Sequence, residues 1–143
     1  MADSTKWCSL LRETRDLSEC KSCLADFLRD ASTPEGAVAD ALLAAEEIII
    51  NVLQHASLPE GGVIELSCTV RGSVLMTIVD PCAQFNPLLE VPQPDLAADD
   101  AVRVEGGFGF YIVREIAESI EYNRRGNRNV LSVKMPAFST ISS

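Results

Sequence analysis

The feature that most constrains the fold is an apolar stretch between residues 34 and 56, long enough for one helix of about 35 Å at about 1.5 Å per residue. Ser32, Pro34 and Glu35 form a start signal: a hydroxyl cap, an early proline and an acid three positions after the cap. The spacing of three and four residues predicts a buried helix face, made of Val38, Ala41, Leu42, Ala45, Ile49, Val52, Leu53 and Ala56.

The side of this predicted helix away from the buried face is also largely apolar, and three polar side chains interrupt it. Glu47, Asn51 and His55 are each four residues apart, so they stack in one ridge on successive turns. Leu43 and Ile48 make the surroundings apolar, where polar groups cost free energy unless something occupies the space before them. The ridge is either an ordinary half-exposed polar stripe or a site wall. In a site wall, the Glu would accept a proton and the Asn would offer an oxygen to a hard cation such as Mg²⁺.

The rest of the chain alternates between helix and strand patterns. Residues 64–71 alternate between apolar and polar side chains, which is typical of a strand with one buried face. Residues 74–79 are apolar on both faces, which favours a central strand. The other expected elements are a strand at 7–11, a helix at 17–28, a helix that opens at Gly106 and carries apolar residues as far as Ile120, and strands at 121–124 and 130–135.

Length and charge narrow the class of protein. A chain of 143 residues is expected to form one domain, 1–143, with a substantial core. Its formal net charge of −9 disfavours nucleic acid and anionic membranes as partners and favours a basic protein surface. No apolar run reaches the roughly 18 residues that span a bilayer, and residues 1–6 lack a signal-peptide pattern, so we expect a cytoplasmic protein.

The five cysteines are expected to be free thiols in a reducing compartment. Cys20 and Cys23 form a C-x-x-C pattern, but no second pair at ligand spacing completes a zinc site. A redox motif would lie between a strand and a helix start, whereas this pair lies within a predicted helix. We therefore favour ordinary helix thiols over a metal site or a thiol-based sensor.

A long irregular segment separates the predicted central strand from the next helix. It runs from Pro81 to Glu105 and is rich in proline and acidic residues, which is typical of a lid, a binding loop or a disordered segment. Asp80 precedes it, either as a turn former or as a site residue. Gly106, Gly107 and Gly109 follow it, and glycines at a helix start either serve turn chemistry or let backbone N–H groups face an anion.

The order of these parts resembles a known family. Glu47, Asn51 and His55 match the Glu-x-x-x-Asn-x-x-x-His box of the anti-sigma-factor serine/threonine kinases, which share the ATP-binding Bergerat fold of gyrase, heat-shock chaperones, histidine kinases and mismatch-repair proteins. The family's second box, Asp-x-Gly-x-x-Phe-Asp-Pro after a strand, is matched by Asp80, Phe85 and Pro87. Its third box, Gly-Gly-x-Gly at the start of a helix, is matched by Gly106, Gly107 and Gly109. The C-terminal part of the family pattern, here called the tail, is similar at Tyr122, Arg124, Gly126, Asn129 and Leu131.

The resemblance implies an α/β sandwich in which a mixed, mainly antiparallel sheet packs on one face against three helices. It also implies ATP and Mg²⁺ as cofactors, with a lid over about residues 86–105. By the same resemblance, Glu47 is the catalytic base and Asn51 holds Mg²⁺. The residues implied to bind the nucleotide are Asn51, His55, Asp80, Cys82, Phe85, Gly106, Gly107, Phe108, Gly109 and Phe110.

The implied partner is a small anti-anti-sigma protein that is phosphorylated on Ser or Thr, with a sigma factor as a second candidate partner and a homodimer as a candidate assembly. The sequence departs from the family at Cys82, where the second box has Gly, and at Glu105, where some relatives carry a basic residue. These departures favour the alternative hypothesis, a nucleotide-dependent switch that binds a partner and transfers no phosphate. An autophosphorylating histidine kinase is disfavoured because the single histidine, His55, lies within the site.

Overall fold

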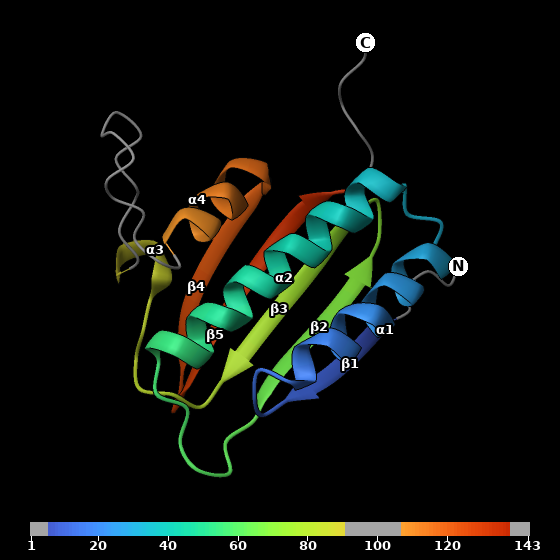
Figure 1. Cartoon of the computed structure of the whole chain (residues 1–143). Coiled ribbons are helices and arrows are strands. Elements are labelled where there is room, and N and C mark those ends of the chain that lie inside the picture. Colours follow the sequence, from blue (N-terminus) through green and yellow to red (C-terminus); the bar gives the residue numbers. More distant parts are fainter. Residues whose placement is uncertain (1–5, 91–106, 138–143) are drawn as a thin grey trace.

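The computed structural model describes residues 6–90 and 107–137, which form a two-layer α/β sandwich (Figure 1). One layer is a five-stranded sheet of order β1-β2-β3-β5-β4, and all four described strand pairs are antiparallel. The fold prediction is confirmed. The sheet was predicted to be mixed and mainly antiparallel, and all of its described strand pairs are antiparallel. The strands are β1 (Lys6–Leu11), β2 (Ile64–Val70), β3 (Ser73–Asp80), β4 (Ser119–Arg125) and β5 (Arg128–Pro136).

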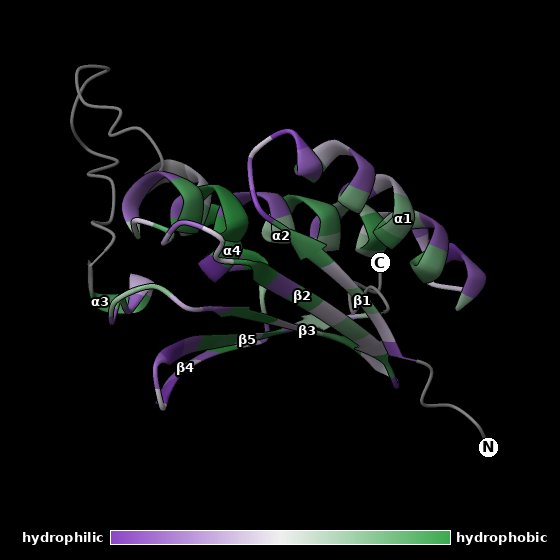
Figure 2. Ribbon diagram, turned by 90° about the horizontal axis from the view of Figure 1, so that it is seen from below, coloured by the Kyte–Doolittle hydropathy of each residue, from purple (hydrophilic) through white to green (hydrophobic). Residues whose placement is uncertain are grey.

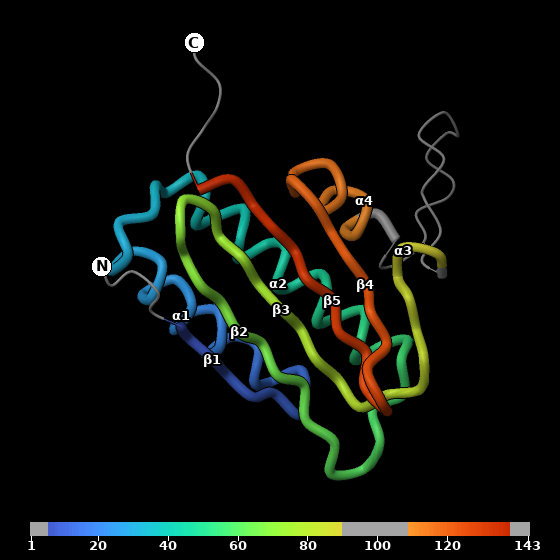
Figure 3. The backbone as a smooth tube through the Cα atoms, turned by 180° about the vertical axis from the view of Figure 1, so that it is seen from behind, coloured from blue at the N-terminus to red at the C-terminus, as the bar shows by residue number. Residues whose placement is uncertain are grey.

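The second layer is helical and covers one face of the sheet. The helices are α1 (Asp16–Asp30), α2 (Glu35–His55), α3 (Pro87–Glu90) and α4 (Gly107–Ile116). Figures 1 and 2 show α1, α2 and α4 on the same side of the sheet, with α2 between the other two. Seen from behind, the strands lie in front of these helices, so none of the described helices covers the second face (Figure 3). No described helix is long and apolar enough to cross a membrane.

The core lies between α2 and the inward face of the sheet. Strict alternation along β2 and β3 sends every second side chain inward, which fits the period of two of a pleated strand. As predicted, β3 is the central strand of the five. Small side chains on α2 allow α1 and α4 to approach it from both sides, because Ala37, Ala41, Ala44 and Ala45 are all buried.

One predicted helix cap and one predicted helix end were wrong. Ser32 does not cap α2: the helix begins at Glu35, the residue before it is Pro34, and that position forms no side-chain cap bond. The Glu35 carboxylate instead pairs with the Arg29 guanidinium at 3.0 Å, a partner that α1 supplies. Helix α4 ends at Ile116, and Ile120 belongs to β4 rather than to the helix.

Candidate functional site

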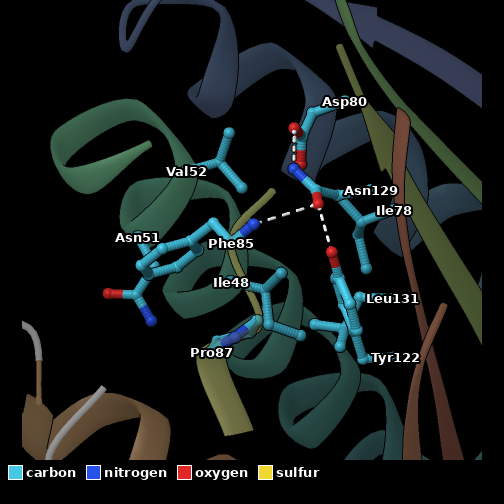
Figure 4. Close-up of a pocket in the computed structure, with 10 residues that line it drawn as sticks. All are labelled: Ile48, Asn51, Val52, Ile78, Asp80, Phe85, Pro87, Tyr122, Asn129 and Leu131. Atoms are coloured by element: carbon cyan, nitrogen blue, oxygen red, sulfur yellow. Dashed lines mark hydrogen bonds between the residues drawn. The ribbon is translucent and has the colours of Figure 1, made fainter. Parts of the chain in front are cut away.

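A pocket lies between the C-terminal half of α2 and the ends of β3, β4 and β5 (Figure 4). Its cavity volume is about 20 Å³, and the pocket opens to the outside. Most of the wall is apolar, with a few polar groups set into it, which is the usual make-up of a small-molecule site. The lining residues are Ile48, Asn51, Val52, Ile78, Asp80, Phe85, Pro87, Tyr122, Asn129 and Leu131.

Asn51 is the polar group that α2 contributes to this wall. Only 2% of the residue is exposed, and within residues 6–90 and 107–137 neither its Oδ1 nor its Nδ2 has a hydrogen-bond partner. A buried amide without partners costs free energy, and native structures contain few such groups. Asn51 is therefore the candidate ligand-binding group of this wall.

The carbonyl oxygen of Asn51 is a type of ligand that a magnesium ion accepts. The described residues contain no cluster of three His, Cys, Asp or Glu side chains that would form a protein-only metal cage. Mg²⁺ usually keeps several waters and takes only one or two protein oxygens together with substrate phosphates. One buried carbonyl oxygen at Asn51 is consistent with that mode of binding.

Glu47 lies one helical turn before Asn51 and faces the start of α4. Gly109 is packed so closely against it that a Cβ at this glycine would overlap the Glu47 carboxyl group. Burial raises the pKa of Glu47, and the neighbouring Glu46 carboxylate raises it further, while Lys21 opposes the shift. The structure thus brings the first and third boxes together and makes the Glu47 carboxylate a better proton acceptor.

Asp80 ends β3 at the opposite wall of the pocket, and 5% of it is exposed. Its Oδ1 accepts hydrogen bonds from the Cys82 backbone N–H and from Asn129 Nδ2, both at 2.9 Å. The Cys82 side chain is buried beside it, and burial together with a hydrogen bond to Asp80 raises the pKa of the thiol to about 12. The Cys82 thiol is therefore protonated near neutral pH.

The structure does not bring every predicted site residue to the pocket. His55 is exposed at the last residue of α2 and is absent from the lining. Phe110 is 1% exposed and packs in the core. Phe85 does line the pocket. Gly106 lies outside the described residues, and Gly107 and Phe108 are described only as the first backbone positions of α4.

Two polar pocket residues had no predicted role, although both belong to the tail match. Tyr122 and Asn129 line the pocket from β4 and β5. Tyr122 and Arg124 are two residues apart on β4, so they share one face of the terminal hairpin, and their side chains meet at Asn129. The alternation of side chains along β4 was the sequence signal that could have placed Tyr122 and Arg124 on one face. By contrast, Cys20 and Cys23 lie on α1, outside the pocket, and all five cysteines are free.

The comparisons with known proteins concern the family and the fold. The model of the histidine kinase-like ATPase domain family matches residues 11–135. A search of curated proteins found no match. Among solved structures, the RsbU and RsbW domains of Rv1364c from Mycobacterium tuberculosis superimpose with a TM-score of 0.64 at 12% identity, over 92% of this chain. The histidine kinase domain of the blue-light activated histidine kinase from Erythrobacter litoralis EL346 gives 0.52 at 21% identity, over 73%.

These structural likenesses support the fold alone, because both identities are low. The chain spans 32% of the first neighbour's length and 46% of the second's.

Proposed function

The chain belongs to the histidine kinase-like ATPase domain family, and on this premise we propose that it is an ATP-dependent serine/threonine protein kinase of the anti-sigma-factor type. The observation that carries this proposal is the Asn51 amide, which is buried in the pocket wall without a described partner, one turn after Glu47. Asp80 stands across the same pocket. In this proposal Asp80 binds the base, Asn51 serves the phosphate side, and Glu47, which lies next to Asn51 on α2 but outside the pocket lining, accepts the proton.

Asp80 is assigned to the adenine. Its Oδ1 is occupied by two protein donors, Cys82 N–H and Asn129 Nδ2. A carboxylate has two oxygens, so Oδ2 is the atom proposed to accept a hydrogen bond from the exocyclic amino group. Ile78 and Leu131 line the pocket nearby and are proposed to pack against the faces of the base.

Asn51 and the start of α4 are assigned to the triphosphate. We assign Asn51 Oδ1 to Mg²⁺, which when bound would neutralise phosphate charge and favour in-line transfer. The first backbone N–H groups of α4, at Gly107 and Gly109, have no partner within a helix and suit an anion, helped by the helix dipole. The absence of a side chain at Gly109 also allows α4 to lie against Glu47.

Glu47 is assigned as the general base. In the proposed reaction it accepts the proton of a Ser or Thr hydroxyl while the hydroxyl oxygen bonds to the γ-phosphorus and ADP leaves. A carboxyl with a raised pKa is a more effective base near neutral pH, since the proton it receives is held more strongly. Positioning of the two substrates is proposed to supply most of the remaining rate.

The proposed partner is a small anti-anti-sigma protein, with a sigma factor as a competing partner. Three ordered boxes that resemble those of anti-sigma-factor kinases support this assignment. A net charge of −9 favours a partner with a basic contact surface.

The second candidate is a switch that binds nucleotide and a partner without transferring phosphate. Cys82 favours it, because a buried thiol stands against the Asp80 carboxylate at a position where the family carries glycine. In this candidate, nucleotide binding changes partner affinity and Glu47 has no chemical role.

The test follows γ-labelled phosphate from ATP to an anti-anti-sigma-type protein that the chain binds. Glu47→Gln is expected to keep Mg·ATP affinity within a few-fold and to lower transfer by about 10² to 10⁴, the range for a positioned base. Asn51→Ala is expected to lose Mg²⁺-dependent nucleotide binding itself. Wild-type transfer by Glu47→Gln would refute the base assignment, and a wild type that binds the partner tightly without transfer would favour the switch.

A further inference from the structure

The side chain of Asn129 forms hydrogen bonds with three separate segments that border the pocket (Figure 4). Asn129 lies on β5 directly opposite Asp80 on β3, and 4% of it is exposed. Its partners come from the end of β3, from residues 82–85 and from β4. A buried amide with partners on this many elements fixes their relative positions.

The donor side of the amide faces three oxygens. Asn129 Nδ2 donates to Asp80 Oδ1 at 2.9 Å and to the Ala83 carbonyl at 3.0 Å, with the Cys82 carbonyl at 3.5 Å. An amide nitrogen has two N–H groups, so the two short contacts use both.

The acceptor side faces three donors. Asn129 Oδ1 accepts from the Phe85 backbone N–H at 3.1 Å, from Arg124 Nη1 at 3.1 Å and from the Tyr122 hydroxyl. A carbonyl oxygen has two lone pairs, so these donors saturate it. Asn129 therefore offers no free hydrogen-bonding group to a ligand, although it lines the pocket.

We propose that Asn129 is a positioning residue of the nucleotide site, one that acts through Asp80 and residues 82–85 rather than by contact with the base. The inference rests on the proposed function. By holding Oδ1 of Asp80, Asn129 leaves the second carboxylate oxygen to the adenine. By holding the Phe85 N–H and the Ala83 carbonyl, it sets the segment that carries Phe85 along the pocket.

Only an amide satisfies both sides of this arrangement. A carboxylate in its place would keep an acceptor for Phe85, Tyr122 and Arg124 but would set a second negative charge against Asp80. An apolar side chain would leave buried donors and acceptors on both sides without partners. The arrangement thus depends on the orientation of the amide, with nitrogen toward β3 and oxygen toward β4.

The test is Asn129→Asp, a near-isosteric change. It replaces the donating amide nitrogen by an oxygen and keeps the accepting oxygen. At pH 8 the introduced carboxylate repels Asp80, and the affinity for a non-hydrolysable Mg·ATP analogue should fall at least tenfold. As the pH falls toward 5.5, a proton shared between the two carboxyl groups restores an O–H···O bond, so affinity should return toward the wild-type value at the same pH. The other titratable or charged groups around the pair are Cys82, Tyr122 and Arg124.

The matched control is Asn127→Asp, which makes the same charge change at an exposed turn of the same hairpin. It should leave the affinity within about twofold of the wild type at each pH. A folded Asn129→Asp that binds like the wild type at pH 8 overturns the inference. A loss that stays the same at both pH values also overturns it, because a merely structural defect has no reason to be repaired by one proton.

A second variant covers the case in which Asn129→Asp does not fold. Asn129→Thr keeps a hydroxyl donor for Asp80 on a strand that tolerates β-branched residues, but it loses the bond to the Phe85 N–H. Faster hydrogen exchange at the Phe85 amide and a several-fold weaker nucleotide affinity are expected; wild-type exchange and affinity would overturn the inference. A wild type that binds no adenine nucleotide would refute the proposed function, a result distinct from normal binding by both variants.

Discussion

Replacing Asn51 by Leu should stabilise the protein and abolish its proposed nucleotide function. The buried amide lacks a described partner at both polar atoms, so the folded chain carries an uncompensated desolvation cost of about 1–3 kcal/mol. Leu branches at the same carbon without polar atoms, and the side chain borders open pocket space, which limits overpacking. The expected gain is therefore about 1–3 kcal/mol in the free energy of unfolding.

For a chain of this length, that gain corresponds to a rise in Tm of roughly 3–10 °C. The assay is thermal and urea unfolding without nucleotide, with Asn123→Leu as the control. Asn123 is an exposed amide on β4, and its replacement should change stability by no more than about 0.5 kcal/mol. Calorimetry of the same Asn51→Leu protein should show Mg·ATP affinity at least tenfold weaker than that of the wild type.

A loss of stability of about 1 kcal/mol or more in Asn51→Leu would refute the reasoning, because it would mean that the amide has good partners in solution. A gain in stability with unchanged Mg·ATP affinity would leave the desolvation argument intact and remove Asn51 from the site. The predicted pair of opposite effects is the usual signature of a residue kept for function at a cost in stability.

Two further predictions concern Glu47 and its neighbour. Gly109→Ala should fold with a stability within about 1 kcal/mol of the wild type, since the helix gain of about 1 kcal/mol offsets a displaced Glu47 rotamer. Gly109→Ala should lower phosphate transfer at least tenfold. The control is Gly36→Ala, where open space surrounds the added carbon, and it should transfer phosphate normally. Normal transfer by both variants would argue against the close approach of α4 to Glu47. Because the folded state raises the pKa of Glu47, the ionised carboxylate disfavours folding above the unfolded value of 4.5. Glu47→Gln should therefore raise the unfolding free energy at pH 7, and the gain should vanish below about pH 4.5 in urea titrations; an equal gain at both pH values would exclude this linkage.

Local periodicity predicted most of the fold. The spacing along α2, the alternation of β2 and the double apolar face of β3 depend only on neighbouring residues, and the structure matches each of them. The cap at Ser32 failed because this residue belongs instead to the turn that ends α1, where its φ is 62° and its backbone N–H donates to the Arg29 carbonyl. This competition between the end of α1 and the start of α2 is invisible to a local pattern.

The site was predicted less completely, for geometric reasons. Steps of four residues advance a helix by about 40° beyond a full turn, so a Glu47–Asn51–His55 ridge rotates by about 80° over its length. Asn51 is consequently buried, Glu47 is half-buried and His55 is exposed. Asn129 had no predicted role because its bond to Asp80 joins residues 49 positions apart, which only the strand register brings together.

The most direct test of the account is calorimetric titration of the wild type and Asp80→Asn with Mg·ATP. The substituted side chain can keep its Oδ1 as the acceptor for Cys82 and Asn129, so the fold should survive, while an amino group replaces the oxygen proposed to meet the adenine. The account predicts binding by the wild type and at least tenfold weaker binding by the variant, about 1.4 kcal/mol. Equal affinities in two folded proteins, or a wild type that binds no ATP, would contradict it.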